Sequence, residues 1–556
     1  MGHLRNSICT VLLAFPILAS AGADVCEGLI QDKVIRPPQT IPKPPKRATY
    51  TDPSFGTTIR RVTAVAVGSE NAVIKPMYAT MQAWNADESF MILWQRGRGH
   101  LLFDGKNYNF IRQLNIAPTD IEQVLWDLVD PDIFYYPTNY DAVPNLMAHR
   151  LSTDTSFLIK NFQGAPTNCP VDWGKLLSLG SDPQYMSYGA QKIVGLKCGD
   201  RKFTYSISQN QILAIGDSPS VNAPIPSPSG NLIYFDGYVL DAAGRFLRTL
   251  DMLEPDSHAS IGRSALGNDS YNAVAFDDAI NGTLVSHNMN TGAKKVIIGP
   301  ATGYPYPPSG THISAIATQN PGWVAVSAVG NPAAPGLLDQ ELVLANTDTG
   351  QVCRIGHHRS WAGEGQWGYW SEPHNVISPS GTRVLFASDW GNGASVDTYV
   401  VELPSFVNDR LPTKVTGFFL YDKVTGKDIV EIKDGDEINL AAYVGRGIDI
   451  RVKVVPANVT MMYLHVNNKS YGLDTTIPYS FFGTGNYSYP GRTNFVLGSN
   501  SVAAVALNDE GKVDGKVPGC DFYFRVPISS CALKFGETAS SLGSQALWGQ
   551  AFMALS

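Results

Sequence analysis

Two stretches of the chain carry the same element, Ser227-Pro228-Ser229-Gly230-Asn231-Leu232-Ile233-Tyr234-Phe235 and Ser378-Pro379-Ser380-Gly381-Thr382-Arg383-Val384-Leu385-Phe386. In each, a Pro presets φ and a Gly supplies a positive φ two residues later, which is the chemistry of a tight turn. The β-branched and aromatic residues that follow are typical of a buried strand. The repetition predicts a fold assembled from similar strand-bearing units.

The region from Phe55 to about residue 408 supports this reading along its whole length. Short alternating apolar runs recur between clusters of Gly, Pro, Asn and Asp, and amphipathic helical pattern is nearly absent. The runs group into seven units of roughly 40 to 60 residues, a period typical of β-propeller blades. The Ser-Pro-Ser-Gly element also resembles the blade repeat of periplasmic Tol-type propellers. We therefore expect an all-β fold with a seven-bladed β-propeller over 55–408, its last blade completed by strands around 57–67.

The N-terminal residues have the layout of a cleaved secretory signal. His3 and Arg5 precede an apolar run from Ile8 to Leu18, and small residues precede Asp24. This order of basic, apolar and small residues predicts a signal peptide over 1–23. The protein is then expected to be secreted, or periplasmic in a bacterial host.

Three further segments flank the predicted propeller. Residues 24–54 are rich in Pro, which disfavours a helix or a central strand, and we expect an extended linker there. Residues 413–528 carry short alternating strands and Asp-Gly turns and predict a β-sandwich. It resembles the immunoglobulin-like modules appended to many secreted polysaccharide-active proteins. Residues 529–556 form a C-terminal tail that is too polar for a lipid-anchor signal.

Charge and hydropathy exclude two classes of partner. Lys and Arg number 42 against 49 Asp and Glu, for a net charge of −7, and no basic run occurs. Nucleic acid is therefore not an expected partner. No stretch after the signal approaches the roughly 18 to 20 apolar residues of a membrane span.

Cysteines and sequons fit an exported protein. Removal of the signal would leave six cysteines, which fifteen full pairings could join, namely Cys26, Cys169, Cys198, Cys353, Cys520 and Cys531. Local closure favours Cys169 with Cys198 and Cys520 with Cys531, which would leave Cys26 for Cys353. Glycosylation in a eukaryotic host is expected at the Asn-x-Ser/Thr sequons, which are Asn268, Asn281, Asn458, Asn468 and Asn486.

The segment Glu372-Pro373-His374 is the strongest candidate for chemistry. Residues two apart in an extended segment share a face, and Pro373 limits the segment to a strand entrance or edge. A carboxylate and an imidazole that converge in this way suit Mn²⁺, Zn²⁺ or Ca²⁺ if a third ligand joins them. The alternative is a hydrogen bond between Glu372 and His374 that braces a turn.

The same stretch, continued through Ser378-Pro379 and 383–389, is similar to the last blade of the oligogalacturonate lyases. These are seven-bladed propellers that cleave uronic-acid oligomers by β-elimination with a bound divalent metal, and the ulvan lyases are comparable. That family has His-Pro-His here and a Gln three residues before the first His. In this chain Glu372 stands at the first His and Tyr369 at the Gln.

The resemblance also implies roles for residues in the two preceding blades. His312, in Gly310-Thr311-His312, matches a further metal ligand, and His258 matches the base that abstracts the proton. The resemblance thus implies a metal bound by His312, Glu372 and His374. β-Elimination needs both a base and a positive centre for the developing carboxylate dianion.

Four other residues could contact an acidic sugar. Arg263 could neutralise or orient its carboxylate, with a surface arginine as the alternative reading. His357, His358 and Trp361 precede or begin a loop rich in Trp and Gly, where they could bind the sugar or cap the propeller rim.

The sequence is compatible with two functions. One is a secreted lyase for uronate-containing glycans, with an acidic polysaccharide or oligosaccharide as substrate. The other is a non-catalytic glycan-binding or cell-surface interaction protein. Convergence of His258, His312, Glu372 and His374 in one site favours the enzyme.

Overall fold

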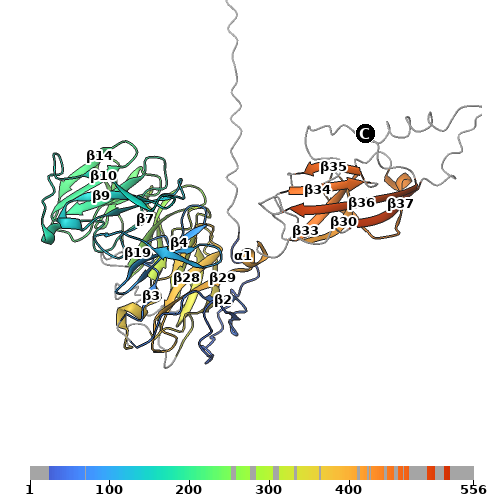
Figure 1. Cartoon of the computed structure of the whole chain (residues 1–556), viewed down its shortest axis with the longest axis horizontal. Helices are drawn as coiled ribbons and strands as arrows, with labels where there is room; N and C mark the ends of the chain where they lie inside the picture. The colour runs from blue at the N-terminus through green and yellow to red at the C-terminus, as the bar shows by residue number, and fades with distance from the viewer. Residues whose placement is uncertain are drawn as a thin grey trace, which may run out of the picture. The chain divides into compact units, whose positions relative to one another are not determined.

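The computed structural model divides into two compact units, residues 1–404 and 405–556, each described by itself (Figure 1). In the first unit it describes residues 24–68, 71–251, 258–275, 283–304, 312–330, 335–361 and 365–404. In the second it describes 405–409, 414–422, 425, 427–443, 448–455, 461–466, 469–474, 498–507 and 519–525. The predicted signal peptide and C-terminal tail lie outside the described residues.

The described residues of the first unit form seven antiparallel sheets, which we number by the order of their inner strands along the chain. Sheet 1 consists of β3 (Ile74–Lys75), β4 (Phe90–Gln95), β5 (Gly99–Asp104) and β6 (Phe110–Gln113). Sheet 2 consists of β7 (Leu125–Trp126), β8 (Ile133–Pro137), β9 (Asn145–Arg150) and β10 (Thr155–Asn161). Sheet 3 consists of β11 (Leu177–Ser178), β12 (Ile193–Cys198), β13 (Arg201–Ser206) and β14 (Gln211–Asp217). Sheet 4 consists of β15 (Ile225–Pro226), β16 (Leu232–Phe235), β17 (Tyr238–Asp241) and β18 (Phe246–Thr249). Sheet 5 consists of β19 (His258–Arg263), β20 (Asp269–Val274), β21 (Leu284–Asn288) and β22 (Lys294–Ile298). Sheet 6 consists of β23 (His312–Ser314), β24 (Trp323–Ser327), β25 (Glu341–Asn346) and β26 (Val352–His357). Sheet 7 combines β1 (Thr49–Thr51), β2 (Thr58–Arg61), β29 (Asp397–Glu402), β28 (Arg383–Ser388) and β27 (Val376–Ile377).

Helix is scarce in the described part of the chain. It comprises α1 (Pro404–Asp409) and the 3-10 turns η1 (Tyr140–Ala142), η2 (Trp173–Lys175), η3 (Pro300–Thr302), η4 (Gly368–Ser371) and η5 (Leu440–Tyr443). None of these described helices has the length and hydropathy needed to cross a bilayer. An almost entirely β structure with repeated four-stranded sheets is consistent with a propeller.

Strands from both ends of the first unit meet in sheet 7. The early strand β2 pairs with β29, with Ile59 opposite Val401, as the sequence predicts. Sheet 1 in turn contacts sheet 7, because β3 lies against β28 and β29. The first and last of the seven sheets are therefore neighbours.

The two Ser-Pro-Ser-Gly elements form matching turns that tie neighbouring sheets together. Gly230 and Gly381 have φ of 75° and 77°, a region that favours glycine. The amide of Ser229 donates to Asp269 of sheet 5 at 2.9 Å, and the amide of Ser380 donates to Glu88 at 2.7 Å. Glu88, which lies between β3 and β4, also pairs with the buried Arg383 of β28. Each repeated turn is thus anchored by a carboxylate next to another sheet.

Residues 24–48, which we call the N-terminal strap, pack against the rest of the first unit. Ile30 forms a β-bridge with Arg354 of β26, so the strap packs on sheet 6. Proline removes backbone donors but leaves carbonyl acceptors. Five side chains donate to carbonyl oxygens of the strap: Arg354 to Val34 at 2.7 Å, His357 to Arg36 at 2.8 Å, Arg359 to Gln39 at 2.5 Å, Trp390 to Ile41 at 3.0 Å and Arg61 to Pro44 at 2.8 Å. Most of these donors lie more than 300 positions away, so no local pattern reveals them.

Two of the three favoured disulfides are present. Cys169 is bonded to Cys198, and Cys26 is bonded to Cys353. The Cys520–Cys531 pairing lies outside the described residues. Cys26 and Cys353 are both fully buried, so this bond fixes the strap to β26 beneath the surface.

Cys26→Ser is expected to lower the free energy of unfolding by about 3 kcal/mol, since loss of a native disulfide relieves the unfolded chain of a constraint. Thermal unfolding of the non-reduced protein measures the effect. Cys353→Ser and the double variant should melt at the same temperature as Cys26→Ser, because all three lack the same bond. A Cys26→Ser protein that melts like the wild type would contradict the expectation.

The second unit contains two further sheets. One consists of β31 (Lys427–Ile432), β30 (Lys414–Asp422) and β33 (Ile448–Val455). The other consists of β32 (Glu437–Asn439), β37 (Gly519–Arg525), β36 (Gly498–Leu507), β34 (Met461–Val466) and β35 (Lys469–Asp474), with β32 parallel to β37. Because β30 contacts β36, the two sheets meet. The immunoglobulin-like sandwich over 413–528 remains a prediction.

Candidate metal centre

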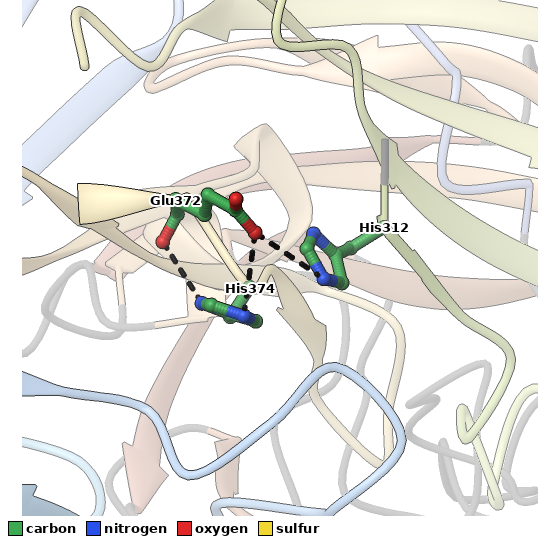
Figure 2. A group of neighbouring side chains, drawn as sticks. All are labelled: His312, Glu372 and His374. Atoms are coloured by element: carbon green, nitrogen blue, oxygen red, sulfur yellow. Dashed lines mark hydrogen bonds and ion pairs between the residues drawn. The ribbon is translucent and has the colours of Figure 1, made fainter. Parts of the chain in front are cut away.

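Three of the predicted site residues converge in the first unit, from two neighbouring sheets. His312 begins β23 of sheet 6, and Glu372 and His374 lie between η4 and β27 of sheet 7. One ligand atom of each side chain lies within 4.8 Å of the other two. The Glu372 carboxylate faces both imidazoles, with its Oε2 atom 3.7 Å from His312 Nε2 and 3.8 Å from His374 Nε2 (Figure 2). We call these three residues the His-Glu-His group.

The local backbone that produces this convergence is not the regular extended segment expected from the sequence. Glu372 ends the turn η4, and β27 begins only at Val376. His374 has a φ of 40°, a left-handed conformation that costs energy for a residue with a side chain. The two side chains therefore meet across a turn rather than on one face of a strand.

The two ring nitrogens of His374 have different environments. Nδ1 donates to the Glu372 carbonyl oxygen at 3.0 Å, so this bond does brace the turn. Burial lowers the pKa of His374 well below its usual value, and the ring is neutral. A neutral ring with its proton on Nδ1 keeps a lone pair on Nε2. That atom is buried and has no hydrogen bond to any residue that the structure describes.

The donor set fits a divalent cation. The Nε2 lone pair of His374 and the Glu372 carboxylate lie close together, and two such electron-rich groups repel each other unless a proton or a cation lies between them. Burial raises the pKa of Glu372 to about 7, an effect that the Lys75 ammonium opposes. A cation would favour the charged carboxylate. Two imidazoles and a carboxylate are ligands that Zn²⁺ and Mn²⁺ accept.

His258 joins the group from sheet 5. It begins β19, and its ring stacks on that of His312 with centroids 4.4 Å apart and an angle of 19° between the planes. The predicted base is thus next to a predicted metal ligand. Sheets 5, 6 and 7 each contribute a histidine at or just before their first strand.

The structure does not bring the other four predicted residues to the group. Arg263 is exposed at the opposite end of β19 from His258 and donates to the Gly267 carbonyl oxygen. His357 and His358 are fully buried and bond backbone atoms: His357 the Arg36 carbonyl, and His358 the Ala328 carbonyl and the Ser360 amide. Trp361 is 36% exposed, and its amide donates to Asp389. Roles for these four in sugar binding have no support in their contacts.

Several other residues lie near the group, and of these only Tyr369 stood out in the sequence. The ring of Tyr78 lies 5.4 Å from that of His312 and 5.3 Å from that of His374. The Tyr369 ring lies 4.7 Å from His374, and its hydroxyl donates to Glu122. Lys75 Nζ lies 4.6 Å from the Tyr369 centroid. Lys75, Tyr78 and Glu122 come from sheets 1 and 2, where no histidine drew attention to the strand starts.

Comparisons with known proteins identify no family at the level of sequence. No protein-family model matches the chain, and no curated protein matches it. Among solved structures, an oligogalacturonate lyase from Vibrio parahaemolyticus is 13% identical, with 64% of this chain and 96% of that chain covered and a TM-score of 0.45. An oligogalacturonate lyase in complex with manganese is 14% identical, with the same coverage and a TM-score of 0.42.

A second kind of protein is also similar in structure. The extracellular domain of a proposed hybrid two-component system from B. thetaiotaomicron is 12% identical, with a TM-score of 0.39. The match covers 86% of this chain and 61% of that one. Identities and TM-scores this low carry no argument about activity.

Proposed function

We propose that the protein is a secreted polysaccharide lyase, built on a seven-bladed β-propeller, that cleaves uronic-acid-containing glycans by metal-assisted β-elimination. The observation that carries this proposal is the convergence of the His-Glu-His group with His258 stacked beside it. Four side chains from three sheets form this arrangement, and together they supply a base and a ligand set. The two disulfides support an oxidising location outside the cytoplasm.

Each residue has a distinct task in this mechanism. His312, Glu372 and His374 would hold the divalent cation, which when bound would supply a Lewis acid for the substrate carboxylate, a contribution of several kcal/mol. His258 takes the proton from the carbon next to that carboxylate. The electron pair of the broken C–H bond then forms the double bond, and the glycosidic oxygen leaves with the electron pair of its C–O bond and takes up a proton from solvent.

A lyase reaction leaves an unsaturated uronate that absorbs ultraviolet light. Purified protein with Mn²⁺, Ca²⁺ or Zn²⁺ should therefore raise the absorbance of at least one uronate-containing polysaccharide in a panel. His258→Ala should lose about 10²- to 10⁴-fold in turnover, the usual contribution of a general base. It should keep its metal, because His258 is not part of the ligand set.

A matched control is His149→Ala, which removes another buried histidine, from β9 in sheet 2. It should keep both metal and turnover. If no acidic glycan gives an unsaturated product but one binds, the protein is a glycan-binding module instead.

A further inference from the structure

Lys75 is an unusual residue for the position it occupies. It ends β3 and is fully buried, and its ammonium has no hydrogen bond to any described residue. Withdrawing an ammonium group from water costs several kcal/mol unless paired groups compensate. An uncompensated donor of this kind next to a candidate site suggests that a ligand provides the missing acceptor.

The surroundings of Lys75 supply only part of that compensation. Its ammonium lies over the rings of Tyr369 and Trp370, at 4.6 and 5.7 Å from their centroids. Burial lowers the pKa of Lys75 to about 8, while the carboxylates of Glu122 and Glu372 act to raise it. These carboxylates attract the ammonium through space, but it has no direct acceptor among the described residues.

One of the two rings beside this ammonium, that of Tyr369, is partly exposed. Tyr369 is 41% exposed and belongs to the short turn η4. Its hydroxyl donates to Glu122 across the unit, which holds the ring over Lys75. The Tyr369 ring therefore lies beside both Lys75 and His374, and its rotation would remove one of the two rings next to the ammonium.

We propose that Lys75 is the residue that recognises a sugar carboxylate at this site, and that Tyr369 moves aside when the acidic sugar binds. This deepens the proposed function, on which it rests, by assigning the preference for an acid over a neutral sugar to a residue outside the ligand set. A carboxylate gives the ammonium its missing acceptor in a charge-assisted hydrogen bond. Lys75 thus determines specificity, whereas His258 performs the proton transfer.

The test uses metal-free protein and measures binding alone. After chelation with EDTA, calorimetry with glucuronate and galacturonate as probes should show binding that glucose and galactose do not show. Lys75→Met keeps the length of the side chain and removes its charge, and it should weaken uronate binding by about 10-fold or more. Tyr369→Phe keeps the ring but loses the bond to Glu122, and it should bind the uronate at least as tightly as the wild type.

A second variant covers the case in which Lys75→Met does not fold. Lys75→Gln keeps a polar group at the end of the side chain and removes the charge, and it should also weaken uronate binding by about 10-fold or more. The proposal is overturned if metal-free wild type binds neither uronate, or if a folded Lys75→Met or Lys75→Gln protein binds them as the wild type does. None of these readouts requires metal or turnover, so failure of the lyase assignment would be seen separately.

Discussion

His374→Ala is expected to lose bound metal and lyase activity together. The alanine removes the imidazole whose Nε2 lone pair faces Glu372. Loss of a hydrogen-bond partner behind a metal ligand typically costs 10- to 100-fold in affinity, so loss of the ligand itself should cost about 100-fold or more. Metal content after dialysis, measured by elemental analysis, gives the primary readout.

Two variants separate ligation from general damage. Glu372→Gln preserves shape and removes the charge, and it should also lose metal. His149→Ala should retain it, since His149 bonds Ser156 in sheet 2 and takes no part in the group. If His374→Ala keeps its metal and its activity, then the bond from Nδ1 to the Glu372 carbonyl is the whole role of this histidine, and the segment is a braced turn.

Acid is expected to unfold the first unit well above the pH at which exposed carboxylates titrate. Burial lowers the pKa of His358 to about 3 and that of His100 to about 4. His358 donates from Nε2 to Ala328 and accepts at Nδ1 from the Ser360 amide, so protonation would break the second bond. Both histidines are therefore neutral in the folded protein.

The lowered pKa values of His100 and His358 mean that the folded protein loses stability as the pH falls. An unfolded histidine binds a proton near pH 6.5 and a folded one only near its lowered pKa, so the unfolded state gains protons first as the pH falls. The stabilisation is complete above about pH 6.5 and is lost progressively down to about pH 4 for His100 and about pH 3 for His358. At 1.36 kcal/mol per pKa unit, the loss over these windows is about 3 kcal/mol for His100 and about 5 kcal/mol for His358. Two such losses are large against a typical stability of about 5 to 15 kcal/mol.

Urea unfolding at pH 7.5, 5.5 and 4.5 measures this dependence. His358→Gln and His100→Gln cannot titrate, so each should be less stable than the wild type at pH 7.5 but lose less stability on acidification. Carboxylates titrate equally in all three proteins, and the difference between slopes isolates the histidine. Parallel decline of wild type and both variants would contradict the prediction.

The sequence predicts the sheets well because their determinants are local. Turn residues and alternating apolar runs mark each unit, and β2 completes sheet 7 as expected. The strap is different, because its stability depends on carbonyls that bond Arg354, His357 and Arg359, far along the chain. A Pro-rich pattern reports extension but not what the extended segment packs against.

In the candidate site, too, some residues could be predicted from the sequence and others could not. His258, His312, Glu372 and His374 could be named because a family resemblance and strand starts pointed to them, and the structure places them together. His357 and His358 sat in an equally suggestive stretch but bond backbone atoms inside the unit. Lys75 was missed because a single lysine before a proline has no distinctive pattern. Only its burial without an acceptor makes it notable.

The disulfide of the strap also constrains the order in which the two disulfides can form during synthesis. Cys26 and Cys353 are separated by 327 positions, whereas Cys169 and Cys198 are separated by 29. As the chain is synthesised, the first cysteine to follow Cys26 is Cys169, which is made long before Cys353, the partner of Cys26. Early closure of the short Cys169–Cys198 loop removes that competitor. Cys26 of the strap then stays without its disulfide partner until Cys353, near the end of the first unit, has been synthesised.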